Sequence, residues 1–119
     1  MKLRLLMTGN ELMSGVTVDS NSALIAQKLE PLSLQVSFKL TIGDDLALLC
    51  AELERLASDS DVLIVNGGLG PTSDDLSAEA LAAVCGVPLE ESATALAHLE
   101  AWCAQRGFCL LYTSPSPRD

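Results

Sequence analysis

The stretch that decides the fold is DVLIVNGGLGPTSDD, at residues 61–75. Its residues 62–65 are apolar without interruption, which is typical of a central parallel strand covered on both faces. The glycines that follow break the chain. A helix is then predicted from about residue 75 to residue 85, and Gly86 ends it. This stretch therefore predicts one strand, loop and helix of an α/β sheet.

The rest of the chain alternates in the same way. Pro31 is expected to end a helix, and the residues after it alternate between apolar and polar, which indicates a strand with one wetter face. The order predicts a doubly wound, mostly parallel sheet with right-handed crossovers. The expected elements are strands at 2–8, 32–42 and 61–66, helices at 19–30, from 44 or 45 to 57, and at 75–85, then a short strand and a last helix from 90 or 91 to about 106.

Length and composition narrow the class of protein. The chain has 119 residues, of which 49% are hydrophobic, so it can hold one core and at most one domain. Seven basic against sixteen acidic residues give a net charge of −9, which argues against binding to nucleic acid or to an anionic membrane. With two Phe, one Tyr and one Trp, a stacking platform for single-stranded nucleic acid is not expected.

The four cysteines form no C-x-x-C pair and have no familiar metal spacing with His98. Reduced, packed thiols in a cytoplasmic protein are the expected state, rather than disulfides or zinc ligands. The apolar start of the chain resembles a short signal peptide, but it stops at residues 9–11 without a small-residue cleavage site, so a first strand is expected. No apolar run is long enough for a membrane span.

The last ten residues, LLYTSPSPRD at 110–119, differ from the rest. Their Ser-Pro-Ser-Pro run cannot continue a helix or a central strand. A natural flexible tail would explain this composition, but the ending also resembles translated adapter or vector sequence. We therefore expect a domain over residues 1–108 that is incomplete at its C-terminal side, and a non-native tail over residues 109–119.

Three polar loops follow the predicted strands, at residues 8–15, 43–45 and 67–75. Because ligands bind at the carboxyl ends of strands in open α/β sheets, all three are expected at one ligand-binding edge. The third loop has the composition of a phosphate cradle, since glycines allow backbone N–H groups to approach an anion and a helix follows. It is not a P-loop, because no Gly-Lys-Ser/Thr follows.

The charge around this cradle is unusual. No Lys or Arg occurs between Arg55 and Arg106, whereas eight acidic residues do. A divalent cation bridging carboxylates and phosphate would explain how such a loop binds an anion. A structural alternative stays open for each loop: Asp74 and Asp75, and likewise Asp44 or Asp45, could merely cap helices. Likewise, Asn10 and Glu11 could lie in a solvated turn, and Asp19 and Asn21 could be a capping residue and a polar residue of the first helical turn.

Four motifs resemble, in order and spacing, the N-terminal domain of the CinA (competence/damage-inducible protein A) family. They are GNELMSG at 9–15, DSN at 19–21, GDD at 43–45 and GGLGPTSDDL at 67–76. That domain is similar to the molybdopterin-binding domains of molybdenum-cofactor biosynthesis proteins. The resemblance covers residues 1 to about 108 and implies a three-layer α/β, molybdopterin-binding-like fold that continues past residues 106–107, usually in dimers or trimers.

The resemblance implies metal-dependent hydrolysis of the pyrophosphate bond of ADP-ribose, giving AMP and ribose 5-phosphate. The alternative that it offers is a molybdopterin- or nucleotide-binding module without hydrolysis. A fragment with an incomplete sheet could itself be inactive. Nicotinamide mononucleotide deamidation belongs to a separate C-terminal domain of the family, of which this chain shows no trace.

The site residues implied by the resemblance fall into three groups. Asp45 and Asp75 are expected as catalytic, water-activating or metal-coordinating carboxylates, with Asp44 and Asp74 as further metal ligands. The ligand is expected to be a small phosphorylated molecule. Its binding residues are expected to be Asn10, Glu11, Ser14, Asp19, Asn21, Gly67, Gly68, Gly70 and Thr72.

Two residues depart mildly from the family pattern. Asn66 stands where relatives often have Thr or Ser, and Ser77 stands where Thr is usual. The run Leu69-Gly70-Pro71-Thr72 favours the CinA-like branch over the pterin binders, whose loop reads Gly-Thr-Gly.

Overall fold

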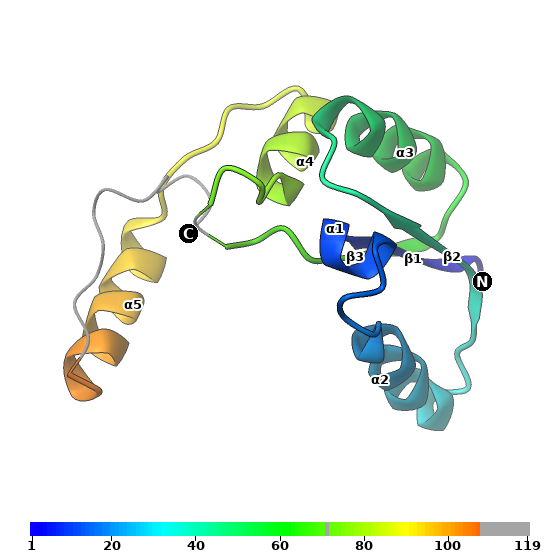
Figure 1. Ribbon diagram of the computed structural model, residues 1–119, viewed down its shortest axis with the longest axis horizontal. Coiled ribbons are helices and arrows are strands. Elements are labelled where there is room, and N and C mark those ends of the chain that lie inside the picture. The colour runs from blue at the N-terminus through cyan, green and yellow to red at the C-terminus, as the bar shows by residue number, and fades with distance from the viewer. Residues whose placement is uncertain (71, 108–119) are drawn as a thin grey trace.

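The computed structural model describes residues 1–70 and 72–107, and the proposed boundary at 108 and the tail lie outside them. Three strands form a parallel sheet in the order β2-β1-β3 (Figure 1). The α/β architecture with a parallel sheet is therefore confirmed. The elements are β1 (Leu3–Thr8), α1 (Asn10–Met13), α2 (Ser20–Leu29), the 3₁₀ helix η1 (Glu30–Leu32), β2 (Val36–Ile42), α3 (Leu46–Ser58), β3 (Val62–Asn66), α4 (Ser77–Cys85) and α5 (Ala93–Gln105).

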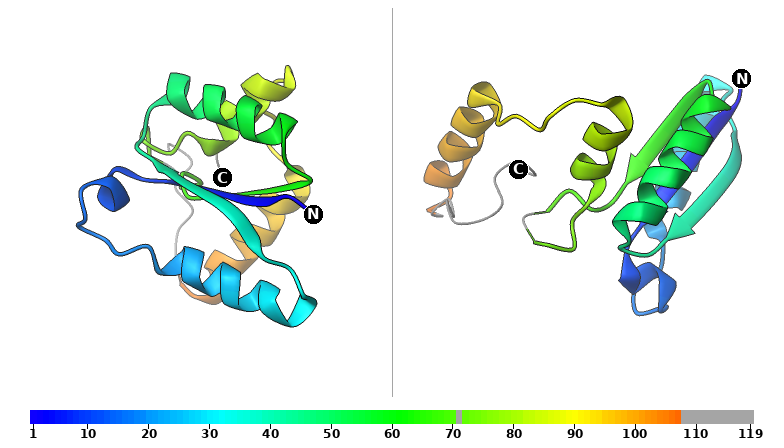
Figure 2. Two further views of the ribbon diagram at one scale, coloured as in Figure 1. Left: turned by 90° about the vertical axis from the view of Figure 1, so that its right-hand side faces the viewer. Right: turned by 90° about the horizontal axis from the view of Figure 1, so that it is seen from above.

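Helices cover both faces of the sheet, with α2 on one side and α3 with α4 on the other (Figure 2). Strand β1 supplies both cores: Leu5 and Met7 face the α2 side, whereas Leu6 packs with Leu49 and Leu53 of α3. Strand β1 is thus the central one, and the expectation that residues 61–66 form the central strand is wrong for the described sheet. The expectation that this strand is covered on both faces is confirmed, because Leu63 packs against the core on the α3 side and Ile64 against the core on the α2 side. In the described sheet β3 is an edge strand and is only partly buried, because its far side has no neighbouring strand there.

The second strand is shorter than predicted, and its alternation is interrupted. Residues 30–32 form η1, so Leu32, the predicted first residue of the strand, is helical, and Ser33 adopts a left-handed conformation with φ 57°. The pairing register with β1 then shifts between Val36 and Phe38. This irregularity turns Val36 toward the α2 side, whereas Leu40 lies on the α3 side. A strict period of two, read from the sequence, cannot reveal such a shift.

Other element boundaries also differ from the predictions. The first polar loop contains a short helix, α1, and α4 begins at Ser77 rather than near residue 75. No strand lies between α4 and α5 in the described residues, so the short strand predicted there is wrong. Pro88 lacks the N–H that a ladder needs, and the segment leaves the sheet altogether (Figure 1). Ser92 caps α5, so this helix starts after the two glutamates.

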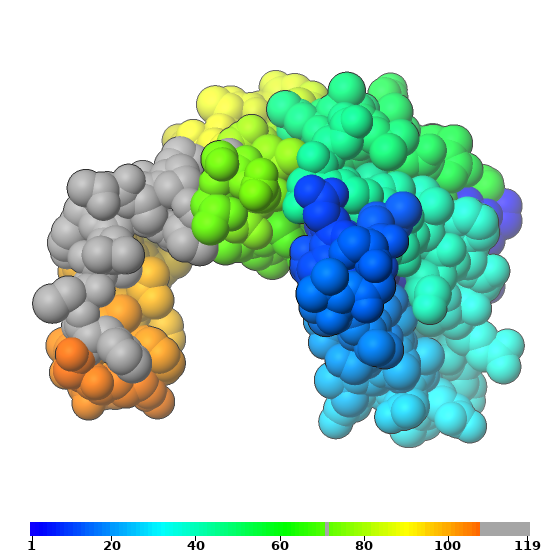
Figure 3. Space-filling model, in the orientation of Figure 1, coloured from blue at the N-terminus to red at the C-terminus, as the bar shows by residue number. Residues whose placement is uncertain are grey.

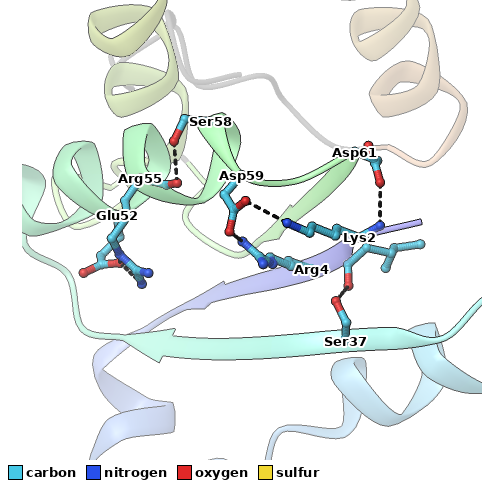
Figure 4. Close-up of polar contacts among 9 residues, drawn as sticks. Lys2, Arg4, Ser37, Glu52, Arg55, Ser58, Asp59 and Asp61 are labelled. Atoms are coloured by element: carbon cyan, nitrogen blue, oxygen red, sulfur yellow. Dashed lines mark hydrogen bonds and ion pairs between the residues drawn. The ribbon is translucent and has the colours of Figure 1, made fainter.

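Charged groups link the amino end of β1 to the segment that leads into β3 (Figure 4). Asp59, just after α3, accepts from Lys2 Nζ at 3.0 Å and from Arg4 Nη1 at 2.9 Å. These hydrogen bonds and charges lower the pKa of Asp59. The backbone N–H of Lys2 donates to Asp61 at 2.6 Å, which fixes the start of β1 beside β3. This end of the sheet is the one opposite to the polar loops.

Helix α5 stands apart from the sheet and its covering helices (Figure 3). None of the helices in the described part of the chain is long and apolar enough to cross a membrane. Cys50, Cys85 and Cys103 are unpaired in the described part of the chain, and Cys109 lies outside it. Cys103 is buried and Cys50 half-buried, whereas Cys85 is exposed, so the expectation of a packed thiol is wrong for Cys85.

Candidate functional site

The three polar loops lie together at the carboxyl edge of the sheet, as parallel strands require. The first and second loops are joined by Asn10 and Asp44. The Asp44 N–H donates to Asn10 Oδ1 at 2.9 Å, and the Asn10 N–H donates to Asp44 Oδ2 at 3.4 Å. The first and third loops meet where Gly67 lies against Thr8, the last residue of β1.

A pocket of about 150 Å³ opens between the first loop, the start of α2 and the end of β3. Asn21 Nδ2 donates to Asn66 Oδ1 at 3.1 Å across it, and so joins α2 to β3. The remaining polar capacity of these two amides is available to recognise hydroxyl or amide groups of a ligand. Of the predicted binding residues, the pocket is lined by Glu11, Asp19, Asn21 and Gly67.

Asp19 serves the fold directly, because it caps α2. Its carboxylate accepts from the backbone N–H of Ser22 at 3.0 Å and from the Ser22 hydroxyl. The hydroxyl hydrogen bond lowers the pKa of Asp19, partly against the effect of burial, and the backbone N–H and the charge of Lys39, 3.9 Å away, lower it further. Asp19 is therefore ionised at neutral pH and adds negative charge to the pocket wall.

The glycine loop begins with two residues of positive φ, Gly67 at 104° and Gly68 at 67°. A Cβ on Gly67 would collide with the carbonyl oxygen of Thr8, so the close approach of the loop to β1 requires glycine. The carbonyl groups of Gly67 and Gly68 both accept hydrogen bonds from Ser77 at the start of α4. The backbone N–H groups of Gly68 and Leu69 donate no hydrogen bond within the described residues.

The second half of this loop is organised by Asp75. Its Oδ2 accepts from the Thr72 N–H at 3.0 Å and from the Thr72 hydroxyl at 2.6 Å, and Gly70 lies against the same carboxylate. Leu76 occupies the N-cap position of α4 without a side-chain hydrogen bond, so the alternative that Asp75 caps this helix is wrong. Asp75 instead closes a turn that holds Thr72 beside the glycines.

The other predicted carboxylates lie in separate surroundings. Asp45 caps α3 by accepting from the Leu48 N–H at 3.0 Å, which is the helix-capping role that the sequence left open. Asp74 is exposed. Within residues 1–70 and 72–107, no group of three or more His, Cys, Asp or Glu residues is arranged to hold a metal ion. The donor set therefore suits only a metal that shares its coordination with ligand oxygens, which is a usual mode for Mg²⁺.

Ser14 lies outside the pocket, where its hydroxyl donates to the carbonyl of Glu11 at 3.4 Å. Two residues outside the predicted set of binding and catalytic residues hold the glycine loop, namely Thr8, the first residue of the first polar loop, and Ser77. Each has only 5% of its surface exposed. The signal that could have identified Thr8 is a hydroxyl at the carboxyl end of a strand whose only other polar residue is Arg4. For Ser77, the signal is a hydroxyl at the start of the helix that follows the glycines.

Comparison with protein families gives a match over residues 4–111 to a family described as "Probable molybdopterin binding domain". Among similar curated proteins, a CinA-like protein of Colwellia psychrerythraea is 57% identical over 106 residues, which are 89% of this chain and 24% of the relative. A CinA-like protein of Shewanella sediminis is 45% identical over 86% of this chain and 24% of its own length. The chain thus spans about a quarter of the length of these relatives.

Two solved structures place the fold. The crystal structure of CinA, a protein of unknown function from Thermoplasma acidophilum, has a TM-score of 0.81 at 30% identity, covering 98% of this chain and 66% of its own. MoaB, a molybdopterin biosynthesis enzyme from Thermus thermophilus, has a TM-score of 0.65 at 19% identity, covering 98% of this chain and 68% of its own. The second likeness concerns the fold alone, and together they confirm the molybdopterin-binding-like architecture.

Proposed function

The chain belongs to the family of probable molybdopterin-binding domains, and from this premise we propose that it binds a small phosphorylated ligand at the glycine loop and hydrolyses nucleotide pyrophosphates such as ADP-ribose. The observation that carries the proposal is the pair of adjacent backbone N–H groups, at Gly68 and Leu69, that have no acceptor within the described residues. Successive free N–H groups in a tight glycine loop form a concave anion site, and they need no basic side chain.

The reaction consumes one water molecule and breaks one P–O bond of the pyrophosphate bridge, so that AMP and ribose 5-phosphate form in equal amounts. Phosphate oxygens are expected on the loop N–H groups, with the rest of the nucleotide toward Asn21 and Asn66 in the adjoining pocket. Asp75 and Asp45 are the carboxylates proposed to hold a divalent ion together with ligand phosphate, or to accept a proton from water. When bound, the ion supplies positive charge that polarises the phosphoryl group.

The direct test is incubation of the full chain with ADP-ribose and Mg²⁺, with chromatographic measurement of AMP. We expect AMP release that stops when EDTA is added. Release no greater than in a protein-free sample would refute the hydrolase proposal. The free cysteines are in keeping with a cytoplasmic protein, and the family resemblance leads us to expect a homo-oligomer, which sedimentation of the same sample would reveal.

A variant separates catalysis from folding at Asp75. Asp75→Asn keeps an oxygen that can accept from Thr72 but removes the charge, so we expect the free energy of unfolding to change by less than about 1 kcal/mol. Turnover should fall by about 100-fold or more, or about 2.7 kcal/mol of transition-state stabilisation. The matched control is Glu54→Gln on the exposed surface of α3, which also removes one charge. Loss of stability and turnover in equal measure would mean that Asp75 only holds the turn.

The second candidate function is ligand binding without hydrolysis, and it is favoured by one observation: the described part of the chain has no group of three residues arranged to hold a metal ion. A binding module for molybdopterin or a nucleotide would need the N–H cradle and the pocket, but no metal. Calorimetric titration with molybdopterin distinguishes the two. Tight binding together with an absence of AMP release from ADP-ribose would select the binding module.

A further inference from the structure

Ser77 combines burial with two hydrogen bonds to one short loop. Its hydroxyl donates to the Gly67 carbonyl at 2.5 Å, and its backbone N–H donates to the Gly68 carbonyl at 3.1 Å. As the first residue of α4, Ser77 has a backbone N–H that is not needed inside the helix. The hydroxyl bond, in contrast, depends on this side chain, because no hydrocarbon side chain could replace the donor.

Thr8 confines the loop from the other side. A Cβ placed on Gly68 would stand 2.6 Å from Ser77 Oγ and 3.2 Å from Thr8 Oγ1, so the loop backbone passes between two buried hydroxyl-bearing residues. These residues come from different elements, since Thr8 ends β1 and Ser77 begins α4. The loop is therefore held at both sides although it consists of flexible glycines.

The orientation of the loop amides follows from these contacts. In a planar trans peptide the C=O and the next N–H point in opposite directions. Because the Gly67 and Gly68 carbonyls point to Ser77, the N–H groups of Gly68 and Leu69 point away from it. If the Gly67–Gly68 peptide turned over, a carbonyl oxygen would replace an N–H at the anion site and repel phosphate. Glycine offers little steric resistance to such a turn.

We propose that Ser77 is a positioning residue, whose hydroxyl keeps the Gly68 and Leu69 N–H groups turned toward the phosphate groups of the ligand. The inference rests on the proposed function in one respect: the ligand carries phosphate. Its role does not require that Ser77 touch the ligand or take part in proton transfer.

The test uses the full chain and inorganic pyrophosphate as the probe. Amide resonances of Gly68 and Leu69 are followed by NMR while pyrophosphate is added to wild type, Ser77→Ala and Ser77→Thr. We expect both amides to shift in wild type. We expect Ser77→Ala to bind about ten-fold more weakly or worse, with smaller shifts at these amides, and Ser77→Thr to recover binding to within about two-fold, because threonine keeps the hydroxyl. Thermal unfolding of all three proteins checks that they are folded, and Ser77→Cys, a weak donor, replaces Ser77→Ala if that variant does not unfold cooperatively.

Each outcome bears on one proposal. Equal affinity of wild type and Ser77→Ala, or weakening that Ser77→Thr does not reverse, would overturn the positioning role. Absence of pyrophosphate shifts at Gly68 and Leu69 in wild type would also overturn it. Hydrolysis is measured separately as AMP release, so a wild type that binds pyrophosphate through these amides but releases no AMP would refute the hydrolase while leaving the role of Ser77 intact.

Discussion

Gly67→Ala tests the close contact between the glycine loop and the central strand. Gly67 has a φ of 104°, and a Cβ there would collide with the carbonyl oxygen of Thr8 and stand 2.9 Å from its Oγ1. Thr8 ends β1, which pairs with both other strands of the described sheet. The backbone of Thr8 therefore cannot withdraw without disturbing the sheet, and the loop must move instead.

The expected cost has two parts. A positive φ costs a residue with a Cβ about 1–2 kcal/mol, and forcing an atom into a packed site costs about 1–3 kcal/mol. Gly67→Ala should thus lower the free energy of unfolding by about 2–5 kcal/mol, a large share of the roughly 5–15 kcal/mol of a typical domain.

The assay is urea unfolding followed by far-ultraviolet circular dichroism, with Gly86→Ala as the matched control. Gly86 also has a positive φ, 68°, but an added Cβ would meet nothing within 4 Å. The free energy of unfolding of the Gly86→Ala control should therefore fall only by the cost of a positive φ, about 1–2 kcal/mol. If Gly67→Ala were no more costly than Gly86→Ala, the loop would not press against Thr8, and the reasoning about a rigid cradle would be refuted.

Three further substitutions test two carboxylates that serve the fold, Asp19 and Asp45. Because the pKa of Asp19 is lowered in the folded state, its contribution to stability is present above the ordinary value of 3.8 and is lost as the pH falls through the lowered pKa. Asp19→Asn keeps a capping oxygen but does not titrate, so its stability deficit at pH 7 should shrink toward pH 2 in acid-dependent unfolding, and a constant deficit would contradict the assignment. Asp45→Ala should cost about 1 kcal/mol by loss of the α3 cap, whereas Asp45→Ser should restore stability. If Asp45 also acts in hydrolysis, AMP release by Asp45→Ser should stay low despite full stability, and normal AMP release would limit Asp45 to capping.

Patterns within single segments predicted most of the architecture. The apolar period in α3 predicts a buried stripe at Leu46, Leu49, Leu53 and Leu56, and the last three are buried as predicted. Leu46, the first residue of the helix, is exposed instead. The order of the strands in the sheet and their register could not be predicted in this way. Residues 62–65 are all apolar and β1 is apolar except for Arg4 and Thr8, so the sequence does not indicate that β1 lies centrally while β3 is the edge of the described sheet. The register shift at the start of β2 arises from pairing with β1 and likewise leaves no local mark.

The neighbourhood of the candidate site followed from topology, because parallel strands bring their carboxyl-end loops to one edge. That rule unites residues as distant as Asn21 and Asn66, or Asn10 and Asp44. It does not say what each side chain does there. A carboxylate shortly before a predicted helix can cap the helix, close a turn or bind a metal, and the sequence alone does not distinguish these roles.

The structure separates these cases through the partner of each carboxylate. Asp45 accepts from an N–H inside its helix, whereas Asp75 accepts from Thr72 on the loop side and leaves the start of α4 to Ser77. Asp75 and Ser77 therefore have different roles where the glycine loop meets α4. The Asp75 carboxylate closes the turn at Thr72, and Ser77 binds the Gly67 carbonyl through its hydroxyl and the Gly68 carbonyl through its N–H. An acidic protein can in this way present backbone N–H groups to an anion, because the orientation of peptide groups, rather than net charge, sets the local potential.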